Sequence, residues 1–438
     1  MSAEIVRSTI FHTPRNPFRE TDALEFIEDG ALLINDGRIQ QCGEYGGIAR
    51  AHPECPVHDL RGGYVLPGFI DTHVHFPQIR ALGGLGHELL DWLECVALPE
   101  EARMADPAYA GQTARSFVRA LIRSGTTTAL VFGAHFSQAT AALFRAAAEA
   151  GIRIVSGLVL SDRRLRPELH QKADDAYRAS NELIAEFHGR DRLLYAVTPR
   201  FALSASEAML EVCQSLLSEH SELRFTTHIN ENHLEIAEVA RLFPWARDYL
   251  AVYEKFGLLG PGAVLAHNIH ASDGEIERIA VSRTAISHCP WSNALLGSGL
   301  FRMRKHVDAG VVCALGSDVG GGAGFGLLKE ALQAYAIQRI APDGMKLSPA
   351  QLLYLSTRAG AEALLLEEET GDFTPGKSAD FVYIKPRAGS LIHGVLERAQ
   401  DAESILAAIL TLGSPEVIEE VRIAGVAPSG STGRGEAI

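Results

Sequence analysis

The sequence reads FIDTHVHF from residue 69 to residue 76, an apolar run that carries two histidines, His73 and His75. Apolar, β-branched runs of this length are typical of buried strands. Side chains two residues apart in a strand point to the same face of the sheet, so the two imidazoles are expected side by side. Neutral imidazoles on one face can share a metal ion, although a lone His-x-His pair also fits two hydrogen-bonded core histidines.

Seven further runs resemble this one, and segments with helical periodicity lie between them. These runs cover residues 125–132, 152–160, 193–201, 224–230, 263–270, 284–290 and 311–318. Strands that alternate with helices imply a parallel sheet. With the first run they make eight units, which predict an α/β fold, a (β/α)8 TIM-like barrel with its functional residues at the carboxyl ends of the strands.

The two ends of the chain have a different pattern. Residues 31–45 read as a hairpin with Asn-Asp-Gly at the turn, and residues 376–386 read as another short strand. We therefore predict three parts: residues 1–66 and 376–438, which together form a small β-sandwich domain, and residues 67–375, which form a metal-dependent barrel.

Composition excludes several classes of protein. The 438 residues carry 40 Lys and Arg against 54 Asp and Glu, a formal charge of −14, with no basic run. Binding to nucleic acid or to an anionic membrane surface is not expected of such a chain. The first residues lack the apolar core of a signal peptide, and no apolar stretch is long enough to span a bilayer. We expect a cytoplasmic enzyme.

The cysteines exclude some metal sites. They are Cys42, Cys55, Cys95, Cys213, Cys289 and Cys313, and no two form a C-x-x-C pair. Zinc ribbons, thioredoxin-like motifs and the deaminases whose zinc is bound by a P-C-x-x-C motif are therefore excluded. Free thiols are expected, with Cys289 and Cys313 as small buried hydrophobes.

Polar side chains gather at the ends of the predicted strands. They are His73, His75 and Gln78 at the first run, Arg200 and Phe201 at the fourth, His228 and Glu231 at the fifth, His267 and His270 at the sixth, and Asp318 at the eighth. Packing alone does not explain why three strands deliver histidines and a fourth an aspartate to the one rim where this fold keeps its chemistry. The sequence therefore predicts a metal site at this rim.

Three imidazoles and one carboxylate suit Zn²⁺, with Fe²⁺ as the second choice. The predicted ligands are His73, His75, His228 and Asp318, with one position left for a water that the metal acidifies. Glu231 follows a ligand by three residues and is predicted to transfer protons, the alternative being a carboxylate that only holds His228. His267 is predicted to contact the attacking oxygen.

A second set of side chains suits recognition of a purine. Arg200 offers a planar fork of donors to a carbonyl oxygen, and Gln78 offers both a donor and an acceptor. Phe201 offers an apolar or stacking surface, although it also fits a simple core position. His270 and His288 are further candidates to line the site, but neither is assigned as a ligand.

These motifs resemble the amidohydrolase superfamily, and the longer ones are similar to the guanine deaminase family within it. The similar segments are PGFIDTHVHFPQ (67–78), LLDWLECVALPEE (89–101), TPRF (198–201), THINEN (227–232), AHNIHAS (266–272), SHCPWSN (287–293), GSDVGGG (316–322) and the return to the β domain at 357–382. The resemblance covers nearly the whole chain. Its most specific part is Pro-Gln after His-x-His together with Pro-Arg-Phe.

The resemblance implies hydrolytic deamination of guanine to xanthine and ammonia, with a small purine as the partner and a homodimer as the assembly. Glu231 and Asp318 would move protons, and His267 would stabilise the tetrahedral oxygen. Members with two metals carry a carboxylated lysine on the fourth strand, and residues 193–201 contain no lysine. One metal ion per chain is therefore expected.

Two departures from the family pattern leave alternatives open. Residues 96–101 read VALPEE where the family has an aromatic-threonine pair before Phe-Pro, and residues 319–327 are rich in glycine. The second segment fits a flexible loop or an active-site lid. The alternative activity is deamination or hydrolysis of another heterocycle, such as 8-oxoguanine, ammeline or a triazine. The alternative from another class is an inactive barrel that serves in assembly, which should have lost ligands or Glu231.

Overall fold

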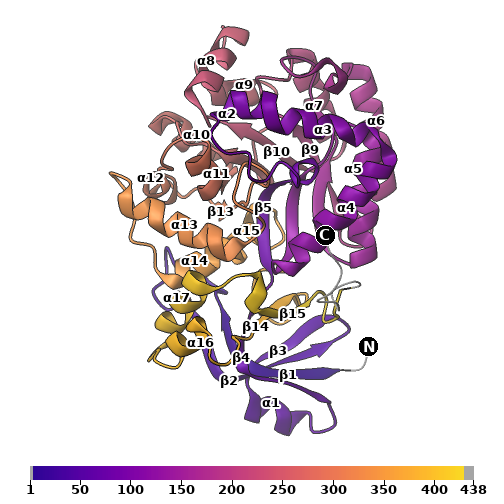
Figure 1. The fold of residues 1–438 in the computed structure, drawn as a ribbon. Coiled ribbons are helices and arrows are strands. Elements are labelled where there is room, and N and C mark those ends of the chain that lie inside the picture. The colour runs from indigo at the N-terminus through magenta and orange to yellow at the C-terminus, as the bar shows by residue number, and fades with distance from the viewer. Residues whose placement is uncertain (1–2, 429–438) are drawn as a thin grey trace.

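The computed structural model describes residues 3–428. Figure 1 shows two parts, a large barrel surrounded by helices and a smaller β domain beneath it that holds strands from both ends of the chain.

The barrel has the eight predicted parallel strands. They are β5 (Phe69–His75), β6 (Thr126–Phe132), β7 (Arg153–Gly157), β9 (Leu193–Pro199), β10 (Arg224–Ile229), β11 (Ala263–His267), β12 (Ala285–His288) and β13 (Cys313–Leu315), paired in chain order, with the short β8 (Val159–Leu160) beside β9. The segment after β13 returns to β5, because His75 N donates to Val319 O (3.0 Å) and Asp318 N donates to His73 O (2.8 Å). The (β/α)8 prediction is confirmed.

Helices cover the outside of the barrel. They are α4 (Pro107–Arg123), α5 (Ser137–Ala150), α6 (Ala173–Phe187), α7 (Glu207–Glu219), α8 (His233–Leu242), α9 (Tyr249–Lys255), α10 (Asp273–Ser282), α11 (Pro290–Leu295), α12 (Met303–Asp308), α13 (Leu327–Ile340), α14 (Pro349–Ser356) and α15 (Arg358–Ala363). In α4, Asp106 caps the first turn, and Ala114, Phe117 and Leu121 recur on the buried face. Over residues 3–428, every helix is too short or too polar to cross a bilayer.

The β domain is one hydrogen-bonded sheet. Its strands are β1 (Glu4–His12), β2 (Glu25–Asn35), β3 (Arg38–Glu44), β4 (Val57–Pro67), β14 (Phe381–Ile384) and β15 (Ile418–Arg422), in the order β15-β14-β4-β1-β2-β3. The predicted hairpin joins β2 and β3, and its turn residues Asp36 and Gly37 have φ of 49° and 75°, as a tight hairpin turn requires. Because β14 pairs with β4, the two ends of the chain form one domain, as predicted.

Two helices in the C-terminal segment were not predicted from the sequence. Between β14 and β15 lie α16 (Leu391–Leu396) and α17 (Ala402–Leu412). Leu406, Ile409 and Leu410 of α17 are buried, and this helix packs on α13 and α14 of the barrel layer. The segment from residue 376 onward therefore contributes to the outer layer of the barrel as well as to the β sheet.

A buried ionic group ties the β domain to the bottom of the barrel. The carboxylate of Asp380, just before β14, pairs with Arg192, just before β9, and accepts from Ser378 Oγ (2.8 Å) and Ala424 N (2.8 Å). Burial raises the pKa of Asp380, but the charges of Arg192 and Arg153 outweigh it and hold the pKa below its ordinary value. The carboxylate therefore stays charged at the contact between the two parts.

Candidate active site

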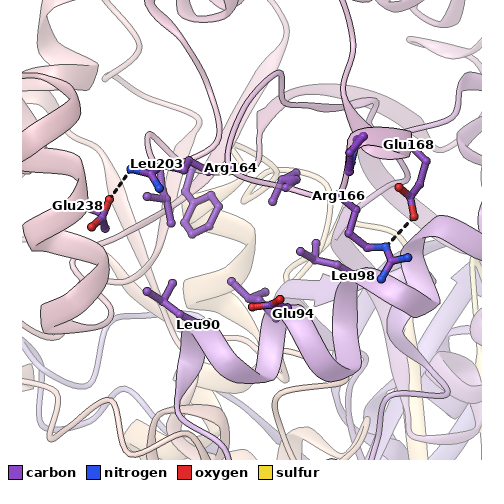
Figure 2. Close-up of a pocket in the computed structure, with 12 residues that line it drawn as sticks. Leu90, Glu94, Leu98, Arg164, Arg166, Glu168, Leu203 and Glu238 are labelled. Atoms are coloured by element: carbon purple, nitrogen blue, oxygen red, sulfur yellow. Dashed lines mark hydrogen bonds and ion pairs between the residues drawn. The ribbon is translucent and has the colours of Figure 1, made fainter.

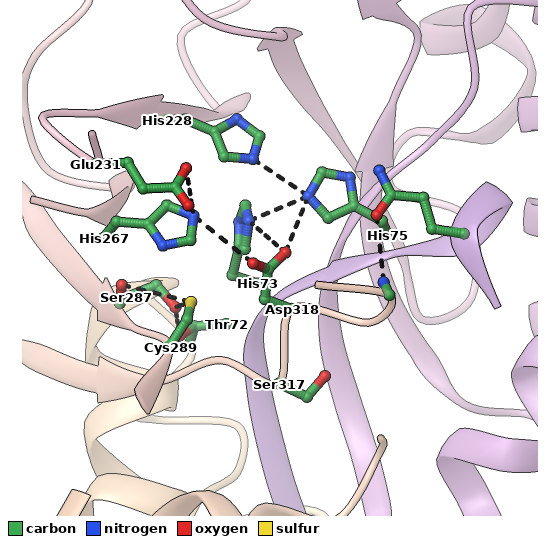
Figure 3. Close-up of polar contacts among 12 residues, drawn as sticks. Thr72, His73, His75, His228, Glu231, His267, Ser287, Cys289, Ser317 and Asp318 are labelled. Atoms are coloured by element: carbon green, nitrogen blue, oxygen red, sulfur yellow. Dashed lines mark hydrogen bonds and ion pairs between the residues drawn. The ribbon is translucent and has the colours of Figure 1, made fainter. Parts of the chain in front are cut away.

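Four side chains from two strands, β5 and β10, and the loop after β13 meet at the carboxyl end of the barrel (Figure 3). His75 Nε2 lies 3.2 Å from His73 Nε2, 3.2 Å from His228 Nε2 and 3.2 Å from Asp318 Oδ1. His73 Nε2 lies 3.3 Å from the same carboxylate oxygen. These are the four residues predicted as ligands, and each contributes one atom to a group whose members lie within 4.8 Å of one another.

The protonation of these imidazoles suits a cation. Burial lowers the pKa of His73 to about 3 and the pKa of His228 well below its ordinary value, so both rings are neutral at pH 7. His228 Nδ1 lies 2.6 Å from Arg200 O, which places the hydrogen on Nδ1 and leaves the lone pair of Nε2 aimed at the group. Converging lone pairs and a carboxylate repel unless a cation lies between them, so this donor set fits one metal ion.

Asp71 on β5 makes hydrogen bonds that support the four candidate ligands. The sequence analysis did not predict a role for it. Its buried carboxylate accepts from Ser317 N (3.0 Å) and His73 N (3.2 Å), and it also pairs with Ser317 Oγ. These contacts join β5 to the loop that carries Asp318, which has a left-handed backbone (φ 47°). Asp71 therefore helps to hold Asp318 against the histidines.

Glu231 lies at the edge of the group, outside the four candidate ligands. Its side chain is buried, and its nearest polar neighbours are Ser298 Oγ (3.4 Å) and His267 Nε2 (3.5 Å). Burial, and next the charge of Asp318, raise the pKa of Glu231 well above its ordinary value. A carboxyl group moved in this direction is suited to take up and release a proton near neutral pH.

A capping interaction fixes the backbone of Glu231. Glu235, in the first turn of α8, accepts from Glu231 N (3.0 Å) and Asn232 N (3.2 Å), and Tyr249 donates to its other oxygen (2.6 Å). Asn232 in turn caps α8. The position of Glu231 is thus set by the start of a helix.

His267 ends β11 with a left-handed backbone (φ 70°) that turns its ring toward the group. Its Nδ1 lies 2.9 Å from Asn293 Oδ1, so Nδ1 carries a hydrogen. Nε2 faces Glu231 Oε2 at 3.5 Å and Asp318 Oδ2 at 3.8 Å.

The three residues predicted to recognise a base line the same cavity. They converge on a fourth residue, Glu101 of α3 (Leu98–Ala102). Arg200 Nη1 donates to Glu101 Oε1 (2.7 Å) and Oε2 (2.9 Å), and Gln78 Nε2 donates to Glu101 Oε1 (2.7 Å). Phe201 is 3% exposed, and its ring lies 5.9 Å from that of His228.

The weaker candidates lie outside the ligand group. His270 lies beyond β11, donates from Nε2 to Ser298 O (2.8 Å) and packs against the ring of His233. His288 stacks on Phe301 at 4.5 Å, and burial lowers its pKa to about 3. Cys289 Sγ could join a second group with His73, His267 and Asp318, but burial raises its thiol pKa well above the ordinary value.

The glycine-rich segment at 319–327 packs against the site. Gly320 N donates to Gln78 Oε1 (3.2 Å), and residues 319–322 are buried. A Cβ on Gly320 would lie 2.6 Å from Gln78 O, and one on Gly322 would lie 2.0 Å from Ser317 O. Close backbone approach thus explains Gly320 and Gly322, whereas added Cβ atoms on Gly324 and Gly326 would meet little.

The cavity over the candidate ligands has a volume of about 20 Å³, and Trp92 and Leu93 help to close it. Both belong to the segment after β5, in α2 (Leu89–Trp92) and η2 (Leu93–Ala97). A groove of about 650 Å³ adjoins the cavity, and the two share Leu93 and Phe201. Figure 2 shows this groove between the α2–η2 segment and the loop of Arg164 and Arg166, with ion pairs to Glu238 and Glu168.

Comparison with known proteins identifies the family to which the chain belongs. The model of the amidohydrolase family matches residues 64–427. The chain belongs to this family. A probable guanine deaminase of Deinococcus radiodurans is 53% identical over 428 residues, which is 96% of this chain and 98% of the relative.

Two solved structures are also similar over their whole length. The guanine deaminase of E. coli has a TM-score of 0.93 and 36% identity, with 98% of this chain and 99% of that chain covered. The guanine deaminase of C. acetobutylicum, solved with guanine bound in its active site, has a TM-score of 0.90 and 27% identity, with 98% and 100% covered. Within the amidohydrolases, the chain is thus similar to proteins named guanine deaminase.

Proposed function

We propose that this protein is a guanine deaminase that hydrolyses guanine to xanthine and ammonia with one zinc ion per chain. The observation that carries the proposal is the meeting of two groups at one cavity. The candidate metal ligands His75, His228 and Asp318 line this cavity together with Arg200, Gln78 and Phe201. The high identity to proteins named guanine deaminase supports the same substrate.

Zinc is the ion we favour for the group of three imidazoles and one carboxylate, with Fe²⁺ as the alternative. When bound there, such an ion supplies an acidified water at neutral pH and polarises the reacting carbon.

Residues of this chain would carry the protons. Glu231 takes a proton from the attacking water and passes it to the ring nitrogen next to C2 of the base. Asp318 Oδ1 faces His73 and His75, whereas Oδ2 lies 3.8 Å from His267 Nε2, and we assign Asp318 to accept the second proton. His267 would stabilise negative charge on the tetrahedral oxygen. The second proton then passes to the 2-amino group, with Glu231 helping to expel it, so that the C2–N bond breaks and the group leaves as ammonia.

The opposite edge of the base is assigned to Arg200 and Gln78. Guanine carries a carbonyl oxygen at C6, which accepts from a guanidinium, whereas adenine carries an amino group there. A site built to bond one substrate group can reject an analogue that lacks it by about 10⁴–10⁵. Phe201 would contact a face of the ring. We therefore expect the protein to turn over guanine and to show little or no activity on adenine or cytosine.

The test is ammonia release from guanine, adenine, cytosine, 8-oxoguanine and ammeline at equal enzyme concentration. Guanine should be among the best substrates, and Arg200→Ala should lower kcat/KM for guanine without loss of metal. If guanine is a poor substrate while ammeline or 8-oxoguanine is turned over well, the base-recognition assignment is wrong. The inactive-barrel alternative is disfavoured, since all four candidate ligands and Glu231 converge.

The remaining expectations stay predictions. A homodimer is implied by the family resemblance and is tested by light scattering of the purified protein. Cytoplasmic location and a part in purine catabolism are tested by cell fractionation and by guanine accumulation in a deletion strain.

A further inference from the structure

Glu101 lies beneath the base-recognition residues and has no place in the proton transfers. Its side chain is 3% exposed and that of Arg200 is also 3% exposed. It accepts from the guanidinium through both carboxylate oxygens and from the Gln78 amide through one. His135 Nδ1 lies 3.3 Å from its second oxygen. Three polar side chains from separate segments, after β9, after β6 and in η1 (Phe76–Gln78), thus surround one buried carboxylate.

Glu101 fixes the orientation of the Gln78 amide. A carboxylate only accepts hydrogen bonds, so the amide nitrogen must face Glu101. Gly320 N only donates, so the amide oxygen must face Gly320, at 3.2 Å. Because the amide nitrogen and the amide oxygen are both hydrogen-bonded, the orientation of the amide is fixed. One N–H and one oxygen lone pair remain for a ligand. Without Glu101 the amide could turn over.

Glu101 also sets the charge that Arg200 presents. An unpaired buried guanidinium would favour an anionic ligand such as a carboxylate or a phosphate. With Nη1 bonded to a carboxylate, the pair is neutral overall, and Arg200 still lines the cavity. Such a pair suits a neutral acceptor, which is what the C6 oxygen of guanine offers.

We propose that Glu101 is a positioning residue that holds Arg200 and Gln78 so that the site prefers a neutral purine with an oxo group at C6. The inference rests on the proposed function, because it assigns the base edge to these two side chains. The competing interpretation is that Glu101 and Arg200 form a buried ion pair that only stabilises the fold.

The chain offers a matched control next to Glu101. Glu100 is the same residue type on the same short helix, but its carboxylate faces outward to Arg103 and Tyr109. Glu100→Gln removes the same charge from the same segment without touching the cavity.

The experiment compares Glu101→Gln, Arg200→Gln, the double variant and Glu100→Gln, each with its metal content measured. The readouts are kcat/KM for guanine and the inhibition constant of 2-aminopurine, which keeps the 2-amino group and lacks the C6 oxygen. Glu101→Gln should lower kcat/KM for guanine by about 10- to 100-fold, because a charged hydrogen bond is lost. The 2-aminopurine constant should change less than threefold, and Glu100→Gln should match the unaltered protein.

The double variant separates positioning from stability. If Glu101 acts through Arg200, adding Glu101→Gln to Arg200→Gln should lower kcat/KM less than threefold further. The comparison of Arg200→Gln with the double variant also tests the proposal if the single Glu101 variant does not fold. The double variant leaves no unpaired buried charge. Equal losses for guanine and 2-aminopurine, or additive losses in the double variant, would overturn the proposal. Absence of guanine turnover in the unaltered protein would instead overturn the proposed function itself.

Discussion

Glu231 transfers protons in the proposed reaction, and its carboxylate makes few polar contacts. Ser298 Oγ and His267 Nε2 are its nearest polar contacts, and Glu235 holds its backbone rather than its carboxylate. The side chain is therefore held near the candidate metal ligands without belonging to them, and its function can be removed without removing the site.

Glu231→Gln keeps the shape of the side chain and removes its acid–base chemistry. We expect turnover of guanine to fall by at least about 10²–10⁴, since general acid–base catalysis contributes that much and Glu231 serves two transfers. Metal content should stay unchanged. Kinetics and metal analysis check both, with the exposed Glu277→Gln as a control. Loss of the metal together with activity would make Glu231 a ligand or its support, contrary to the assignment.

The residues that sequence reasoning found share one property. His73 and His228 lie near the carboxyl ends of β5 and β10, and Glu231 and Asp318 lie shortly after β10 and β13, so the barrel prediction alone brings them together. Glu101 and Asp71 were missed because their roles depend on partners far along the chain, Arg200 for one and Ser317 for the other. Glu101 did lie in the segment singled out as a departure from the family pattern, and that was the only signal for it.

At the scale of elements, the loop after β13 is shaped by contact with the first strand. Gly320→Ala would place a Cβ 2.6 Å from Gln78 O and 2.9 Å from Ala81 Cβ. We expect a loss of stability of about 1–3 kcal/mol, as for other overpacked positions, and a lower kcat/KM for guanine as Gln78 shifts. Gly326→Ala is the control in the same loop, since its nearest neighbour would be Lys329 Cγ at 3.9 Å. Equal behaviour of the two variants would refute this account of the loop.

The elements themselves could be predicted where periodicity is strong. All eight barrel strands and the 31–45 hairpin were predicted, because buried parallel strands read as apolar runs and Asn-Asp-Gly marks its turn. The sequence did not reveal that His267 and Asp318 take left-handed backbones, because only the surrounding packing imposes that conformation. The helix α17 was missed because its run lies in a segment assigned to strands.

At the scale of the whole molecule, Asp380 links the β domain to the barrel. Asp380→Ala would leave the partly exposed Arg192 and the buried Arg153 without this counter-charge, and breaking a buried pair costs about 3–5 kcal/mol. Urea unfolding should show a loss of this size. Glu186→Ala, which breaks the exposed pair with Arg145, should cost about 0–1 kcal/mol. A loss at Asp380 no larger than at Glu186 would show that the contact adds nothing to stability.

Stability should also fall in mild acid because buried histidines are neutral in the folded chain. Burial lowers the pKa of His306 to about 4, whereas the unfolded value is near 6.5. The folded state binds fewer protons between these values, so the stability contributed by His306 is present above pH 6.5 and is lost as pH falls toward 4. His306→Gln should reduce the slope of the urea midpoint against pH over this range. An unchanged slope would contradict the assignment of a neutral buried ring.

The central claim is that one metal ion, held by His73, His75, His228 and Asp318, makes this barrel a guanine deaminase. Titration of the chelated protein with Zn²⁺, followed by ammonia release from guanine, tests it most directly. We expect no release from the metal-free protein, and a linear rise that saturates at one equivalent per chain. Saturation only at two equivalents, or full activity in the metal-free protein, would contradict the account.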